Sequence, residues 1–120
     1  MSQFPNKYDL EERTAKFGEG VISFCRGIKY DPVTTPLINQ LVRSATSIGA
    51  NYMEANGASS KKDFGNKIYF CKKEAQETKH WLRMIGVCIS EDKKERLQSL
   101  WKECQELTLI FQKNGSSLKS

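Results

Sequence analysis

The sequence predicts an all-α protein, an antiparallel up-down-up-down four-helix bundle. Apolar residues recur at steps of three and four along four segments, which is the spacing of one face of an α-helix. Short stretches with capping and turn residues separate these segments, and short loops place consecutive helices antiparallel. Strand-like alternation of apolar and polar residues is nearly absent. Residues 1–120 are therefore expected to form a single domain, since this length suits one core.

The first helix is expected over residues 9–28. Asp9 is a suitable N-cap, and Glu11 and Glu12 lie in the first turn, where carboxylates interact favourably with the helix dipole. Thr14 occupies a gap in the apolar pattern. That pattern consists of Leu10, Phe17, Val21, Phe24 and Ile28.

The second helix is expected over residues 36–56. Thr35 offers a capping hydroxyl, Pro36 suits the first helical position, and Asn56-Gly57 is typical of a helix end. Within this helix the stretch RSATSIGANYMEA, residues 43–55, is rich in small residues. Because a mid-helix glycine costs roughly 1 kcal/mol relative to alanine, its presence favours a close seam in which a neighbouring backbone approaches Ala45 and Gly49.

The third helix, over residues 60–86, has the most regular pattern in the chain. Ser60 is its expected cap, supported by Asp63 three residues later, and Gly86 can end it. Its seam follows a heptad spacing and consists of Phe64, Ile68, Cys71, Ala75, Thr78, Leu82 and Ile85.

The fourth helix is expected over residues 91–114. It begins after Ser90 with two acidic residues, and Gly115 closes it, which leaves residues 115–120 as a frayed tail. Its apolar face consists of Leu97, Leu100, Cys104, Leu107 and Phe111.

Composition argues against several functional classes. No apolar run approaches the roughly 20 residues needed to span a bilayer, and the N-terminus lacks the pattern of a signal peptide, so a cytoplasmic protein is expected. The four cysteines form no C-x-x-C pair and are expected to be structural thiols, and His80 is the only histidine. With no glycine-rich phosphate loop and no recognisable catalytic frame, we expect no enzyme activity and no catalytic, cofactor-binding or metal-binding residue.

Positive charge is concentrated on the third helix. Between residues 61 and 83 there are seven cationic residues against three anionic ones, a net of +4 out of +5 for the whole chain. On a helical wheel, Lys61, Lys72, Lys79 and Arg83 fall on one flank of the seam. Such a stripe is expected of a surface that binds the phosphate backbone of nucleic acid, RNA or DNA. A solvated lysine-rich surface would have the same pattern.

The opposite flank of the third helix carries Phe70, Glu74 and Trp81. Its two aromatic residues predict a further packing surface, against a neighbouring helix or another subunit, although a wide core stripe would also account for them. If the second and third helices form a tight hairpin around residues 57–59, Arg43 lies level with Glu74. A structural ion pair between these two residues is therefore expected. In the same register Glu54 lies level with residues 62 and 63.

These motifs resemble a known family. RSATSIGANYMEA followed by KKDFGNKIYFCKKEAQETKHWLRMI resembles the small four-helix-bundle family of bacterial 23S rRNA intervening-sequence proteins, often labelled S23 ribosomal proteins. This family includes the accessory variability proteins of diversity-generating retroelements. The resemblance covers about residues 35–85. The chain departs from the family pattern at Ala55, where glycine is usual, and at His80, where tyrosine is usual.

The resemblance implies a homopentameric barrel of four-helix protomers without catalytic activity and with a basic surface that contacts nucleic acid. In the retroelement members that surface also serves a reverse transcriptase. Together with the lysine flank, it favours a non-enzymatic, oligomeric nucleic-acid-binding protein. The alternative is a protein-interaction scaffold or accessory subunit that docks an acidic partner or a reverse transcriptase.

Overall fold

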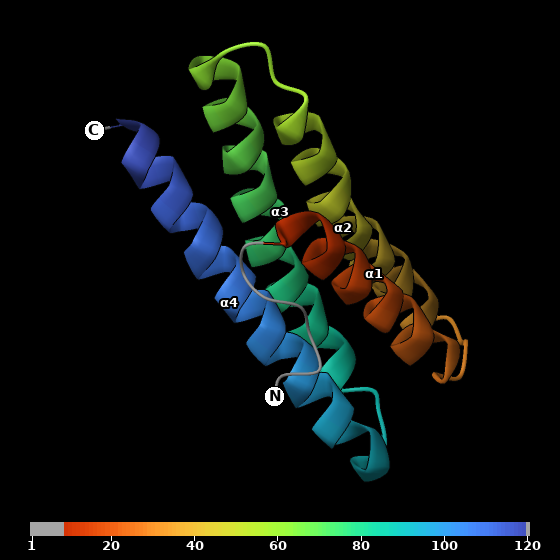
Figure 1. Ribbon diagram of the computed structural model, residues 1–120. Coiled ribbons are helices and arrows are strands. Elements are labelled where there is room, and N and C mark those ends of the chain that lie inside the picture. The colour runs from red at the N-terminus through yellow and green to blue at the C-terminus, as the bar shows by residue number, and fades with distance from the viewer. Residues whose placement is uncertain (1–8, 120) are drawn as a thin grey trace.

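The computed structural model describes residues 9–119, with side chains through residue 114, and consists of four antiparallel α-helices (Figure 1). The helices are α1 (Leu10–Arg26), α2 (Thr34–Asn56), α3 (Lys61–Gly86) and α4 (Lys94–Lys119), and a short 3-10 helix, η1 (Glu91–Lys93), precedes α4. Each helix packs against the next along the chain, and α1 also contacts α4. The predicted up-down bundle is therefore confirmed.

The core runs between the four helices and is formed by the predicted seams. Helix α1 contributes two fully buried apolar side chains, Phe17 and Val21, and α3 contributes its seam from Ile68 onward. The fully buried large apolar side chains include Phe17, Val21, Ile38, Leu41, Ile48, Ile68, Leu82, Ile85, Leu100 and Leu107. Helix α1 has 17 residues, against 23 in α2 and 26 in each of α3 and α4. It therefore covers only part of the length of the bundle (Figure 1).

The start of α2 differs from the prediction, because Asp31 rather than Thr35 provides the capping group. The Asp31 carboxylate accepts hydrogen bonds of 2.8 Å from the backbone N–H groups of both Val33 and Thr34. In return, the Thr34 hydroxyl oxygen accepts a 3.0 Å bond from the Asp31 N–H. The helix consequently begins at Thr34, two residues early. Pro36 then lies in the first turn, where its missing N–H group leaves no helical hydrogen bond unmade.

The other helix ends differ by a few residues. Helix α1 ends at Arg26, two residues before the predicted end. The chain forms η1 after Ser90 before α4 begins at Lys94. Helix α4 also continues through Gly115 to Lys119, beyond the predicted end at residue 114. Glycine lowers helix stability by only about 1 kcal/mol, so Gly115 does not by itself stop the helix.

The small residues of the 43–55 stretch form the seam between α2 and α1. An added Cβ at Gly49 would lie 3.3 Å from the Thr14 hydroxyl oxygen, and one at Gly18 would lie 3.7 Å from the Cα atom of Thr46. Ala45 on the same face is fully buried. The missing side chains thus allow two helix backbones to approach closely, as predicted, and the approaching helix is α1.

The cysteines are free thiols. Cys25, Cys71 and Cys104 are buried, whereas Cys88 is exposed in the loop after α3. Burial raises the pKa of the Cys25 thiol to about 11 and that of Cys71 and Cys104 to about 12. These three thiols therefore remain protonated at neutral pH and act as small packing groups.

Over residues 9–119, no helix contains a segment that is both long and apolar enough to cross a membrane.

Candidate nucleic-acid interface

Helix α3 has two chemically different flanks on either side of its buried seam. One flank lies toward α4 and carries Lys72 and Lys79. The other lies toward α2 and forms a polar groove with it. The position of both flanks follows from the seam, because residues three and four apart share one helix face and the intervening positions fall to its sides.

The lysines of the first flank lie beside aromatic rings. Lys72 is half-buried, and its Nζ atom is 5.4 Å from the centroid of the Tyr69 ring. Lys79 is also half-buried; it donates a hydrogen bond to Gln105 Oε1 of α4, and its Nζ atom is 5.5 Å from the centroid of the Trp101 ring. Both distances are within the range of cation–π interactions, which leave the positive charge unneutralised.

The other two predicted cations, Lys61 and Arg83, are exposed at the two ends of α3. Among the side chains that the structure describes, none of the four predicted residues forms an ion pair with a carboxylate. Lys16, Arg43 and Lys67, in contrast, all have carboxylate partners within 4 Å. The positive charge of the α4-facing flank is therefore available to an external anion.

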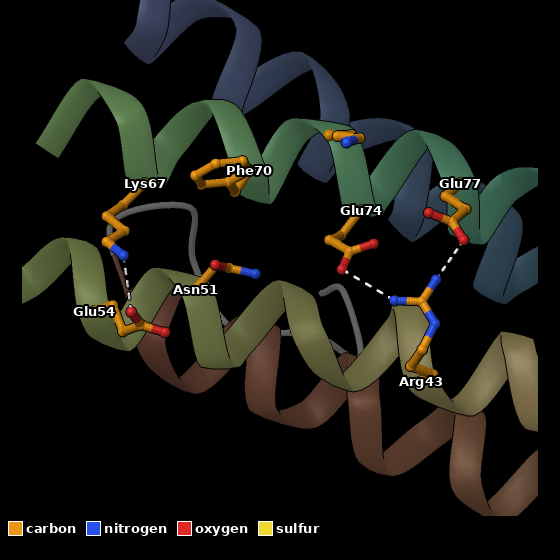
Figure 2. A pocket seen from close by; sticks show the side chains of 8 residues that line it. Arg43, Asn51, Glu54, Lys67, Phe70, Glu74 and Glu77 are labelled. Atoms are coloured by element: carbon orange, nitrogen blue, oxygen red, sulfur yellow. Dashed lines mark hydrogen bonds and ion pairs between the residues drawn. The ribbon is translucent and has the colours of Figure 1, made fainter. Parts of the chain in front are cut away.

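The α2–α3 groove holds a network of ion pairs (Figure 2). Arg43 Nη1 lies 3.2 Å from Glu74 Oε2, and Arg43 Nη2 donates to Glu77 Oε1. The structure thus brings Arg43 and Glu74 together and adds Glu77 as a second partner. The arginine side chain is 47% exposed, so the pair lies at the surface. An ion pair at the surface contributes little to stability.

Glu54 pairs with Lys67, whereas the predicted hairpin register places it level with residues 62 and 63. Its carboxylate lies 2.9 Å from Lys67 Nζ, about one helical turn beyond residues 62 and 63. The connection occupies residues 57–60, which is longer than the tight turn assumed for the sequence, and α3 is shifted accordingly. The buried contacts show the resulting register, in which Thr78 Oγ1 lies 2.9 Å from Ser44 Oγ.

The two aromatic residues of this flank have different environments. Phe70 is 43% exposed and points into the groove (Figure 2). Trp81 is half-buried, packs against the core and donates a 3.2 Å hydrogen bond from Nε1 to Glu77 Oε1. Trp81 therefore belongs in part to the wide core stripe, whereas Phe70 remains an exposed apolar surface.

The pKa of Glu77 lies below its ordinary value of 4.5. Burial alone would raise it, but the hydrogen bond from Trp81 and the charge and hydrogen bond of Arg43 outweigh that effect. A carboxylate with a depressed folded pKa contributes stability above its unfolded pKa and loses it as the pH falls through the folded value. This contribution is small, because exposed pairs are worth at most about 1 kcal/mol.

We therefore expect Glu77→Gln to flatten the acid limb of the stability profile. Between about pH 5 and pH 3 the free energy of unfolding should fall less steeply in the variant than in the wild type. Urea unfolding at a series of pH values measures this difference. Equal slopes in the two proteins would show that the Arg43–Glu77 contact carries no energy in solution.

The relationship to known proteins is shown by the match over nearly the whole chain. A family model described as 23S rRNA-intervening sequence protein matches residues 7–113. The chain belongs to this family. It is also similar to a crystal structure of a protein with unknown function from the S23 ribosomal protein family of Bacteroides thetaiotaomicron. The TM-score is 0.73 and the identity 26%, with 92% of this chain and 96% of that chain covered. No curated protein matches the sequence.

Membership of the 23S rRNA-intervening sequence protein family confirms the resemblance found in residues 35–85 and extends it over both outer helices. The similarity to the Bacteroides protein concerns the four-helix architecture over almost its entire length. Within the described part of the chain, no group of three or more His, Cys, Asp or Glu side chains comes together.

One polar site in this family member was missed by the sequence reasoning. Arg13 of α1 and Glu103 of α4 are 6% and 3% exposed, and they form a bidentate pair. The Nε–Oε2 and Nη2–Oε1 distances are both 2.7 Å, and Glu106 Oε1 lies 3.1 Å from Nη2. The hydrogen bonds from Arg13 to Glu103 raise the pKa of the guanidinium despite its burial. The pair joins the two terminal helices across the bundle.

Proposed function

We propose that this protein is a non-enzymatic, oligomeric nucleic-acid-binding protein that contacts phosphates through the α4-facing flank of α3. The observation that supports this function is the contrast between cations. Lys72, Lys79, Lys61 and Arg83 have no carboxylate partner among the described side chains, whereas Arg43 and Lys67 of the α2–α3 groove are paired with carboxylates of the protein. Unpaired cations on one helix face attract a polyanion without base specificity.

Self-association would strengthen this binding. The stripe in one protomer is modest, and a homopentamer, as the family resemblance implies, would present it five times. Repeated sites raise the apparent affinity because every contact after the first becomes intramolecular. The exposed Phe70 in the α2–α3 groove offers apolar area for a neighbouring subunit.

A second function is favoured by the same exposed aromatic residue. Phe70, 43% exposed in a groove lined by both basic and acidic side chains, would also suit a protein partner. In this alternative the protein acts as a scaffold or accessory subunit for an acidic protein or a reverse transcriptase. The lysine flank would then dock that partner.

The charge-reversal variant Lys72→Glu/Lys79→Glu tests the proposed function. At low salt it should lower the affinity for structured RNA and duplex DNA by at least about tenfold, and the slope of log affinity against log salt should decrease by about 2. Fluorescence anisotropy at several salt concentrations measures both quantities. Light scattering on the same samples reports the oligomeric state.

The matched control is Lys16→Glu/Lys29→Glu, which changes the net charge equally but on α1 and the loop that follows it. Its effect on affinity should be much smaller. Binding that is absent in the wild type, or lowered equally by the two double variants, would contradict a phosphate-binding role for α3. A protein partner retained after nuclease treatment and lost in Lys72→Glu/Lys79→Glu would favour the scaffold function.

A further inference from the structure

The α3–α4 face carries exposed aromatic rings beside its unpaired lysines. Tyr69 on α3 is 54% exposed and Trp101 on α4 is 41% exposed, although both are large side chains that proteins usually bury more fully. Each ring lies next to a lysine of the flank, Tyr69 beside Lys72 and Trp101 beside Lys79. Each of these two lysines therefore has an exposed aromatic ring beside it.

The arrangement is held in place by the helices. Tyr69 and Lys72 are three residues apart and thus share one side of α3. Lys79 bridges to α4 through its hydrogen bond to Gln105, one turn after Trp101, and this bond keeps the ammonium group near the indole ring. Tyr69 and Lys79 are about 15 Å apart along the α3 axis, at 1.5 Å per residue. The two aromatic rings are therefore separated by a distance that a few nucleotides can span.

The two aromatic rings provide flat surfaces for base stacking, which the binding of phosphates alone does not require. A duplex offers its phosphates to lysines, but its bases are stacked and paired, so their faces cannot reach a protein side chain. Unpaired bases can stack on aromatic rings, and a lysine beside each ring can then contact the adjoining phosphate. Without an acidic residue paired to either lysine, the face suits a polyanion with exposed apolar faces.

We propose that the α3–α4 face binds single-stranded nucleic acid, with bases stacked on Tyr69 and Trp101 and phosphates at Lys72 and Lys79. The proposal rests on the nucleic-acid-binding function proposed above and specifies its substrate. The same flank that attracts any polyanion at low salt discriminates in favour of unpaired strands through its two rings.

The experiment compares binding of an unstructured oligothymidylate or oligouridylate of about 20 nucleotides with binding of a duplex of equal length. Tyr69→Leu and Trp101→Leu keep apolar side chains at the two positions but remove the flat π surface. Each should lower the affinity for the single strand by about 5- to 100-fold and leave the affinity for the duplex unchanged. Tyr30→Leu, at a 59% exposed tyrosine in the loop between α1 and α2, is the matched control.

Fluorescence gives an independent measurement. The protein has two tryptophans, Trp81 and Trp101, so in a Trp81→Phe background the emission reports Trp101 alone. Single-stranded nucleic acid should quench it and the duplex should not. Absence of quenching, or a loss of affinity in Tyr30→Leu equal to that in Tyr69→Leu, would overturn the stacking proposal.

The outcomes also separate the two proposals. If Lys72→Glu/Lys79→Glu lowers binding while both leucine variants bind the single strand normally, the phosphate-binding function stands and the stacking proposal is wrong. If the wild type binds neither strand form at any salt concentration, both are wrong. If Tyr69→Leu or Trp101→Leu alters the oligomeric state without affecting the binding of nucleic acid, the rings belong to a subunit interface and the stacking proposal is again wrong.

Discussion

Arg13→Met is expected to lower the free energy of unfolding by about 3–5 kcal/mol. The substitution leaves Glu103, which is 3% exposed, as a buried carboxylate without its bidentate partner. Loss of the buried charge pair costs more than the pair itself contributes, because the remaining ion is desolvated and uncompensated. Urea unfolding of the wild type and the variant at the same protein concentration measures the effect.

Two variants isolate the origin of this effect. Lys16→Met removes an exposed α1 cation whose contacts with Glu12 and Glu19 are 3.8 and 3.7 Å long, and it should change stability by less than about 1 kcal/mol. Arg13→Met/Glu103→Leu replaces both buried charges with apolar groups and should recover most of the lost stability. If Arg13→Met and Lys16→Met were equally mild, the Arg13–Glu103 pair would not be buried in solution.

The buried Arg13–Glu103 pair also shows where sequence reasoning reaches its limit. The seams of all four helices could be predicted, since burial of one helix face requires apolar residues at steps of three and four along the sequence. The same logic assigns a charged residue to solvent, so the apolar pattern of α1 places Thr14, and not Arg13, on its core face. Yet Arg13 lies three residues after Leu10 and four before Phe17, and Glu103 lies between Leu100 and Leu107 at the same spacing. The sequence signal for this buried pair is the presence of oppositely charged residues at core positions of two different helices.

The candidate interface was predictable in part for a related reason. A helical wheel assigns Lys72 and Lys79 to one flank of α3 from α3 alone. It cannot place Trp101 or Gln105 beside Lys79, because these residues are on another helix, and their position depends on the rotation and axial shift of α4. The same dependence on a second helix explains Glu54, whose partner is Lys67 because the 57–60 connection shifts α3 along α2.

Phe17→Ala should lower the free energy of unfolding by about 3–5 kcal/mol, as expected for removal of a large buried aromatic side chain. Phe17 is fully buried and lies one turn after Arg13 on the same face of α1. Because α1 is the shortest of the four α-helices and contacts α4 less extensively than it contacts α2, few other side chains can compensate for the cavity. Phe17→Leu, which retains most of the volume, should cost only about 1 kcal/mol.

Hydrogen exchange would show how this destabilisation is distributed. If Phe17 and Arg13 together hold α1 on the other helices, Phe17→Ala should accelerate exchange of the α1 amides before those of α3, since local opening then requires less energy than global unfolding. The control Ile22→Ala truncates a 40% exposed side chain of the same helix and should leave the exchange pattern of α1 close to that of the wild type. Equal acceleration in all four helices would mean instead that α1 opens only with the whole bundle, and that its docking is part of a single cooperative transition.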